Sequence, residues 1–148
     1  MLKKKLVVRN PQSTRPWQHV LDPLFGYLLL GYNLKNNRVN GQKFNFGPPS
    51  SREISVKKLL DTFCPLLINA SWKTKKVEKL YEANLLKLDS SKSKKILNWK
   101  PVINIEKLAK MTTDWYKVYY KNKKLCLELS KSQIDEYLEL QRQNDKNL

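Results

Sequence analysis

The sequence predicts a fold that mixes short strands with helices, of the α/β or α+β class. Apolar residues make up 41% of the 148 residues, which is ordinary for a folded domain and argues against wholesale disorder. Short apolar runs that end at Asn-Pro or Gly-Pro breakers predict two or three strands. Longer stretches with apolar residues at helical spacing predict about four helices, and there is no internal repeat.

The first half of the chain predicts strands and helices in alternation. Residues 6–9 are predicted as a short buried strand. A helix follows, with Asp22 as its N-cap and Pro23 at its first helical position. Residues 43–46 (KFNF) are predicted as a second strand, and Ser55 is predicted to cap a second helix.

The second half predicts one more strand and a short helix. Residues 72–76 alternate between apolar and polar and predict an edge strand. Asp89 and Ser90 are predicted to cap a short helix over residues 92–97, after which Asn98 begins a turn.

The longest predicted helix covers residues 105–120, where apolar residues recur on one side. A last helix, capped by Ser130 or Ser132, is expected to run to residue 140, and residues 141–148 are expected to form a frayed polar tail. Two isolated short strands make a marginal sheet. The predicted strands therefore look like additions to a larger sheet.

The charge of the chain is strongly basic, with 29 Lys and Arg against 13 Asp and Glu and a formal net charge of +16. Such a chain can bind nucleic acid or an anionic membrane surface. The excess is nearly all lysine and is scattered along the chain, whereas a phosphate-reading site would concentrate arginine. We therefore expect no nucleic-acid partner, and a basic nucleic-acid-binding protein remains the alternative.

The cysteines and the apolar runs bear on the compartment. Cys64 and Cys126 lack metal-ligand or CxxC spacing, so we expect reduced, buried thiols and a cytoplasmic protein. The run LFGYLLLGY is well below the roughly 20 apolar residues that a membrane span needs. No signal-peptide core is visible, so we expect a soluble protein with no membrane partner.

The residues that most enzymes of this size would use are missing from the sequence. No glycine-rich loop follows the first strand, so there is no dinucleotide fingerprint or P-loop. With His19 as the single histidine, a catalytic triad or a histidine metal site would depend on one ring. We expect His19 to be a packed structural residue, with a role in a binding pocket as the alternative. The sequence thus predicts no catalytic residues and no metal site.

Although the chain has no set of catalytic residues, Arg15 and Trp17 could form part of a ligand-binding pocket. Arg15 lies in a polar turn before a helix, where its guanidinium could hold a phosphate, and Trp17 offers an aromatic plane for a base or sugar. The residues leave open the alternative that Arg15 caps a carbonyl and Trp17 packs in the core.

Four segments resemble one enzyme family. They are RNPQSTRPWQHVLDPLFGYLLL, KFNFGPPS, YEANLLKLDSSKSKKILNWKPVINIEKLAKMTTDWYKVYY and LELSKSQIDEYL. Together they resemble, in order, the part of the CDP-glucose 4,6-dehydratases that follows the nucleotide-binding core. The resemblance covers about residues 7–140, and its TRPWQHV core is specific.

The resemblance implies a fold and an organisation. The family belongs to the extended short-chain dehydrogenase/reductases, in which a Rossmann domain holds NAD and a smaller C-terminal domain holds the nucleotide sugar. Residues 1–140 are similar to that C-terminal sugar-nucleotide-binding portion, together with late strands and helices of the Rossmann domain. The N-terminal NAD-binding core and the acid-base residues of the family would precede Met1. We therefore expect either a truncated product or a separately encoded N-terminal half.

The resemblance also implies ligands and partners. In the complete enzyme, NAD takes hydride from C4 of the hexose, water leaves across C5–C6, and hydride returns to C6, which makes CDP-4-keto-6-deoxyglucose for surface polysaccharide. The family implies a CDP-sugar as ligand and a homo-oligomer of the complete enzyme. This chain alone is expected to bind no NAD and to be inactive. The alternative is a non-catalytic sugar-nucleotide-binding module or pseudoenzyme subunit.

Four residues are implied to bind the substrate. Arg15 matches the arginine that grips the nucleotide diphosphate, and Trp17 falls where relatives place an aromatic near the nucleotide. Glu82 matches an acidic residue on the loop that closes over the nucleotide, and Lys79 falls near a basic phosphate ligand. Tyr81 replaces the usual histidine of the family.

Overall fold

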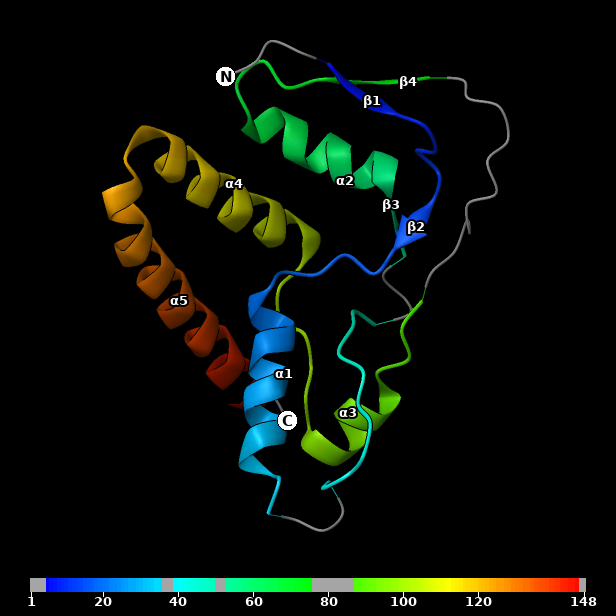
Figure 1. The fold of residues 1–148 in the computed structure, drawn as a ribbon, viewed down its shortest axis with the longest axis vertical. Coiled ribbons are helices and arrows are strands. Elements are labelled where there is room, and N and C mark those ends of the chain that lie inside the picture. Colours follow the sequence, from blue (N-terminus) through cyan, green and yellow to red (C-terminus); the bar gives the residue numbers. More distant parts are fainter. Residues whose placement is uncertain (1–4, 36–38, 50–52, 76–86, 147–148) are drawn as a thin grey trace.

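The computed structural model describes residues 5–35, 39–49, 53–75 and 87–146, and it confirms the mixed α/β class (Figure 1). Four short strands alternate with five α-helices and two 3₁₀ turns in these ranges. In chain order the elements are β1 (Leu6–Val8), β2 (Thr14–Arg15), α1 (Leu21–Tyr32), β3 (Ile54–Ser55), α2 (Val56–Phe63), η1 (Cys64–Leu66), β4 (Trp72–Thr74), α3 (Ser91–Leu97), α4 (Ile105–Lys121), η2 (Lys123–Leu125) and α5 (Cys126–Lys146).

The strands form two separate pairs. β1 pairs in parallel with β4, so that Leu6 lies opposite Trp72. β2 pairs antiparallel with β3, so that Arg15 lies opposite Ile54. The strand predicted near residue 72 is confirmed, but the prediction that the first strand is buried is wrong, since Leu6 is 52% exposed. A short apolar run predicts a strand without showing whether other elements cover its faces.

The segment at residues 43–46 is not a strand, which corrects the sequence prediction. Its side chains alternate as in a strand, but its backbone groups bond to side chains. The carbonyl of Phe46 accepts from Nε2 of Gln18 at 2.7 Å, and the carbonyl of Asn45 accepts from the hydroxyl of Ser93. Phe46 itself is buried in the core. Side chains of other segments thus supply the hydrogen-bond donors that a neighbouring strand would supply in a sheet.

Helix α1 begins differently from the prediction. Its N-cap position is Val20, which makes no side-chain capping bond, so the prediction that Asp22 is the N-cap is wrong. Asp22 lies inside the first turn and is fully buried, and its Oδ1 accepts from the backbone nitrogen of Val102 at 3.0 Å. Its carboxylate is therefore used for a tertiary contact.

Two apolar clusters form the core. The first contains Phe46 and Trp99, whose rings meet edge to face at 5.1 Å, together with Val39 and Leu97. Gly26 allows this packing, because a Cβ at that position would lie 2.4 Å from the Phe46 ring. The second cluster joins α4 to α5 and consists of Ile103, Leu108, Met111 and Tyr137.

The turns around α3 follow the predicted residues, with one change. Asn98 has a φ of 52°, in the left-handed region that asparagine tolerates, and it ends α3. Oδ1 of Asp89 accepts from the backbone nitrogen of Ser91 at 2.9 Å, so Asp89 supplies the cap. Ser90 makes no capping bond, because its hydroxyl bonds to the backbone of Gly47.

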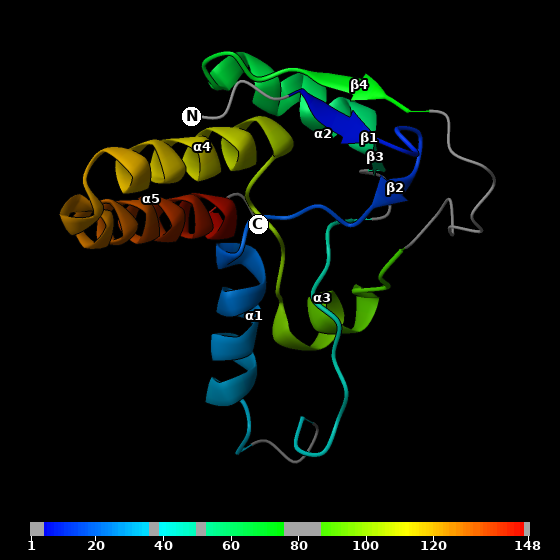
Figure 2. The ribbon, with the colours of Figure 1, turned by 45° about the horizontal axis from the view of Figure 1, so that its top comes forward.

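Helices α4 and α5 form an antiparallel hairpin (Figure 2). The long helix predicted at residues 105–120 is confirmed, with Asn104 accepting from the backbone nitrogen of Lys107 at 2.8 Å. The prediction that Ser130 or Ser132 caps the last helix is wrong, because α5 begins at Cys126 and contains both serines. The expected frayed tail is helical as far as Lys146.

No helix in the described ranges is long and apolar enough to cross a membrane.

Candidate functional site

Arg15 lies on β2 and is fixed by the pairing with β3. It is partly buried, and its Nη1 donates to the carbonyl of Thr14 at 2.8 Å. This bond is the carbonyl contact that the sequence left as one alternative for Arg15. A guanidinium is planar and has five N–H donors, the geometry that suits a phosphate.

Trp17 is tied to the same strand pair. Its Nε1 donates to the carbonyl of Ile54 at 3.1 Å, and Ile54 is the residue opposite Arg15. The backbone nitrogen of Trp17 also donates to the carbonyl of Arg15 at 2.8 Å. The structure thus brings Arg15 and Trp17 together on the β2–β3 pair, and it anchors the indole of Trp17 through its only donor.

An apolar cavity of about 460 Å³ adjoins Trp17 and lies between residues 17–21 and helices α2, α4 and α5. Its walls include Leu59, Phe63, Met111 and Trp115. No Lys, Arg, Asp or Glu is among the described residues that line it. A diphosphate is bound best by cationic side chains, and none of the described residues that line this cavity is a lysine or arginine, so the cavity does not suit one.

His19 lines the apolar cavity and is 7% exposed. Its Nδ1 accepts from the backbone nitrogen of Leu21 at 3.3 Å, which places the proton of the neutral ring on Nε2. Burial lowers the pKa of the His19 imidazole below its ordinary value of 6.5. These contacts agree with the structural role expected for His19.

A second pocket, of about 620 Å³, has the opposite chemistry. It lies between residues 47–49, the start of α3 and residues 99–101, and its charged lining consists of Lys87, Lys94 and Lys100 with the single carboxylate of Asp89. We call it the lysine pocket. Lys87 forms an ion pair with Glu53, the residue that precedes β3. The pocket is therefore connected to the strand pair that carries Arg15, and its cations suit an anionic ligand.

Two of the four residues implied to bind the substrate lie outside the described residues. Lys79 and Glu82, together with Tyr81, fall within residues 76–86. That segment follows β4 and ends next to Lys87 in the chain. The lysine pocket was missed by the sequence reasoning, because its lysines are separated in sequence and only the fold brings them together.

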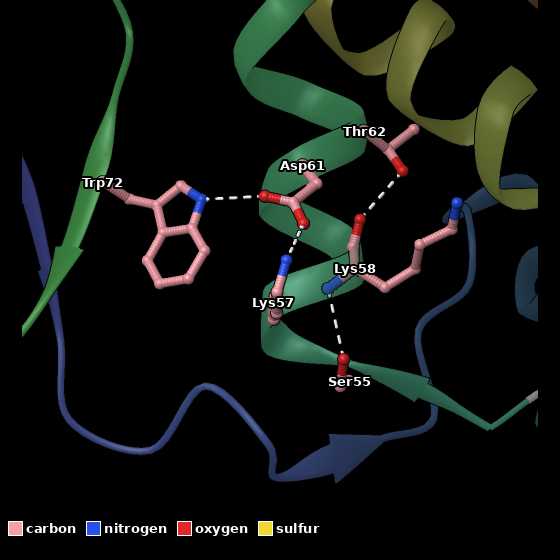
Figure 3. Close-up of polar contacts among 6 residues, drawn as sticks. All are labelled: Ser55, Lys57, Lys58, Asp61, Thr62 and Trp72. Atoms are coloured by element: carbon pink, nitrogen blue, oxygen red, sulfur yellow. Dashed lines mark hydrogen bonds and ion pairs between the residues drawn. The ribbon is translucent and has the colours of Figure 1, made fainter.

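A polar cluster holds β4 to α2 (Figure 3). Oδ1 of Asp61 accepts from Nε1 of Trp72 at 3.0 Å, and Oδ2 of Asp61 pairs with Nζ of Lys57 at 2.6 Å. The bond from Lys57, with that from Trp72, lowers the pKa of Asp61. Ser55 accepts from the backbone nitrogen of Lys58 at 3.2 Å, which confirms it as the cap of α2. The contacts of this cluster therefore have structural roles: they hold β4 against α2 and cap the start of α2.

The cysteines and acidic residues show no metal site. Cys64 and Cys126 are free and half-buried, so the expected burial is only partial. In the described ranges, no group of His, Cys, Asp and Glu side chains is arranged to hold a metal ion.

Comparison with known proteins begins with the fold. No family model matches the chain. A solved structure of RMD from Pseudomonas aeruginosa complexed with NADPH is similar, with a TM-score of 0.52 and 18% identity, over 71% of this chain and 33% of that chain. This likeness shows the fold alone: the mixed α/β fold of this chain is similar to part of that structure.

Two known proteins are similar to this chain in sequence. The chain is 33% identical over 140 residues to the CDP-glucose 4,6-dehydratase of Salmonella typhimurium (strain LT2), which covers 91% of this chain and 38% of that protein. It is 30% identical over 118 residues to GDP-mannose 4,6 dehydratase 1 of Arabidopsis thaliana, covering 76% of this chain and 30% of that protein. The chain thus spans about a third of the length of these relatives. The chain is similar in sequence to part of these 4,6-dehydratases, and its resemblance to CDP-glucose 4,6-dehydratase is confirmed.

Proposed function

We propose that this chain provides the CDP-sugar-binding part of an NAD-dependent dehydratase that makes CDP-4-keto-6-deoxyglucose for surface polysaccharide. The observation that carries the proposal is the 33% identity over 91% of the chain to the CDP-glucose 4,6-dehydratase of Salmonella typhimurium. The matched chain includes Arg15 on β2 and Trp17, whose indole nitrogen donates to Ile54 of β3.

Arg15 is the residue that we propose grips the diphosphate. A guanidinium can donate two parallel hydrogen bonds to phosphate oxygens, and its position on a paired strand limits its freedom. The lysine pocket, which is linked to β3 through Lys87 and Glu53, supports an anionic ligand on this part of the molecule. Trp17, Lys79 and Glu82 complete the proposed set, with Trp17 beside the nucleotide.

The described residues do not fit NAD. A dinucleotide site needs glycines at a strand-to-helix turn, so that the backbone can approach the pyrophosphate. In this structure Gly26 faces the ring of Phe46, and Gly47 faces Leu88 and Ser90. The space beside each is filled by side chains. We therefore propose that NAD belongs to the complete enzyme, and that the 148-residue chain alone neither binds NAD nor turns over CDP-glucose.

Calorimetric titration of the 148-residue chain with CDP-glucose tests the proposal. Charge-assisted hydrogen bonds contribute about 1.5–3 kcal/mol, so Arg15→Ala should weaken binding by roughly ten- to a hundredfold. Arg15→Lys should recover only part of this loss, because lysine keeps the charge and loses the planar fork. Arg142→Ala is the matched control, since Arg142 is exposed and forms an ion pair with Glu139 on its own helix.

The same samples separate binding from folding. If Arg15 only braces the β2–β3 pair, Arg15→Ala lowers the melting temperature and leaves the dissociation constant for CDP-glucose unchanged. That result would remove Arg15 from the proposed site. Equal affinity for CDP-glucose and for a nucleotide without a diphosphate would contradict the diphosphate role as well.

A further inference from the structure

The connection between α4 and α5 forms an exposed tip at one extremity of the molecule (Figure 2). We call residues 116–127 the α4–α5 tip. Tyr120 is 70% exposed, and Leu125 and Leu127 are 48% and 67% exposed. The 3₁₀ turn η2 packs only against α4 and α5 among the elements with substantial contacts. Apolar side chains of this size are thus presented to solvent at a protruding turn.

The charged side chains of residues 116–127 are all lysines, and the tip is flanked by Asp114, which pairs with Lys117 at 3.9 Å, and by Glu128. Lys117, Lys121, Lys123 and Lys124 are all exposed, and residues 116–127 contain no Asp or Glu. The lysines therefore lie among apolar and aromatic residues over the last six residues of α4, the 3₁₀ turn η2 and the start of α5. The hairpin assembles this cluster, which is separate from the lysine pocket and differs from it in having exposed aromatic and apolar residues between its lysines.

The tip is also an ordered structure. Oδ1 of Asn122 accepts from the backbone nitrogen of Lys124 at 3.1 Å, and the backbone nitrogen of Asn122 donates to the carbonyl of Val118 at 2.7 Å. Nζ of Lys123 lies 4.8 Å from the centre of the Tyr119 ring. These contacts hold the turn in one conformation with its apolar residues outward.

We propose that the α4–α5 tip is a docking surface for an anionic phospholipid bilayer. Tyrosine and leucine at a turn can enter the headgroup region, and lysines beside them are attracted to anionic lipid. The proposal concerns a peripheral contact, since no described helix can cross a membrane. It departs from the sequence-based expectation of no membrane partner, because the cluster becomes evident only at the tip of the hairpin.

Charge and chemistry favour lipid over two other partners. A second copy of this chain docked tip to tip would bring four lysines against four lysines, which outnumber the flanking Asp114 and Glu128, and the net effect is repulsive. Single-stranded nucleic acid would use the lysines and could stack on Tyr116 and Tyr120. It would not use Leu125 and Leu127, whose exposure a lipid surface explains.

Sedimentation of the 148-residue chain with vesicles tests the proposal. We expect it to pellet with phosphatidylcholine vesicles that contain phosphatidylglycerol and to stay in solution with pure phosphatidylcholine. Added potassium chloride should release it, because surface charges are screened. Equal binding to both vesicle types, or binding to neither, would overturn the proposal without any variant.

Two pairs of variants locate the contact. Replacing Lys117, Lys121, Lys123 and Lys124 by Gln should lower the vesicle partition coefficient at least about tenfold. The matched control replaces Lys35, Lys43, Lys73 and Lys95 by Gln, which removes the same charge from exposed positions elsewhere. The control should keep most of the binding. Equal losses in the two variants would show a diffuse charge effect and overturn the proposal.

The apolar contact has its own test. Leu125→Ser with Leu127→Ser should weaken vesicle binding by about tenfold. The matched control is Leu28→Ser with Ile68→Ser, two positions that are 71% and 78% exposed on other elements. An unchanged partition coefficient in the tip variant would overturn the proposal. So would oligothymidine binding that the lysine variant abolishes while vesicle binding persists, since the tip would then bind nucleic acid.

Circular dichroism and thermal melting accompany each variant. All replaced residues are exposed, so the helical signal and a cooperative melt should be retained.

Discussion

Asp22 and Val102 lie 80 positions apart, and the Oδ1 atom of Asp22 accepts from the backbone nitrogen of Val102 at 3.0 Å. The carbonyl of Asp22 also accepts from Nε1 of Trp99 at 2.9 Å. One residue of α1 thus fastens the segment between α3 and α4. Because Asp22 is fully buried, these bonds are made away from water, where an unmade bond is costly.

We expect Asp22→Ala to lower the free energy of unfolding by about 2–3 kcal/mol, because it leaves the backbone nitrogen of Val102 without its acceptor. Chemical denaturation with urea measures this change. Asp135→Ala on the exposed face of α5 is the control and should change the value by less than about 0.5 kcal/mol. Equal effects of the two substitutions would show that the buried bond contributes nothing.

Tyr137 predicts a loss of stability at alkaline pH. Burial raises the pKa of the Tyr137 hydroxyl above its ordinary value of 10.0, with a further contribution from the Asp22 carboxylate. The folded state therefore holds this proton more tightly than the unfolded state does. Its contribution to stability is complete below pH 10 and declines as the pH rises further. Above pH 10, Tyr137→Phe should lose stability less steeply than the natural chain.

The exposed Tyr32, at 86%, provides the control for that experiment. Tyr32→Phe should leave the pH dependence of the unfolding free energy unchanged. Parallel curves for Tyr137→Phe and the natural chain would contradict the role of burial.

His19 predicts a loss of stability in mildly acidic solution. Because burial lowers its pKa below 6.5, the unfolded state binds the proton more readily than the folded state does. The contribution of His19 is complete above pH 6.5 and is lost as the pH falls toward the folded pKa. The chain has one histidine, and the lowered pKa values of Asp61 and Asp89 place their titration at lower pH.

Thermal melting between pH 6.5 and about pH 5 measures this effect. The natural chain should lose stability over this interval, while His19→Gln should be nearly insensitive. A steep dependence retained in His19→Gln would assign the effect to other groups.

The bond between Trp72 and Asp61 predicts local rather than global weakening. Trp72→Phe removes the indole donor that ties β4 to α2 and keeps an aromatic ring. We expect faster amide exchange at Leu6 and Lys75, whose backbone nitrogens bond to the carbonyls of Ser71 and Val8 across the β1–β4 pair. Amides of α4 serve as the internal reference. Unchanged exchange at Leu6 and Lys75 would show that α2 does not hold the strand pair.

The sequence predicted elements well where local signals decide the structure. Ser55 caps α2, Asn98 takes the left-handed conformation, and the long amphipathic helix lies within one residue of its expected range. The errors have tertiary causes. Asp22 looked like an N-cap because its distant acceptor role is invisible locally, and Ser130 looked like a cap although its hydroxyl accepts from Trp115 of α4.

In the candidate site, too, some residues could be predicted from the sequence, whereas others depend on tertiary contacts. The resemblance selected Arg15 and Trp17, and the fold places Arg15 on β2 and ties the indole of Trp17 to Ile54 of β3. The lysine pocket could not be predicted, because Lys87, Lys94 and Lys100 stand among many other lysines and no local pattern distinguishes them. Its recognition depends on where residues 47–49 pack, and that follows from the contacts of Ser90 with Gly47.

The pairing of Phe46 with Trp99 also has a consequence for how the chain acquires its structure during synthesis. Translation proceeds at about 5–20 residues per second, so Phe46 emerges several seconds before Trp99 is available to meet it. Helix α1 appears earlier still, with Leu24, Tyr27 and Leu28 exposed even in the finished fold. The nascent first half therefore exposes apolar side chains to solvent during that delay. Slowing the ribosome between codons 46 and 99 should increase its capture by molecular chaperones.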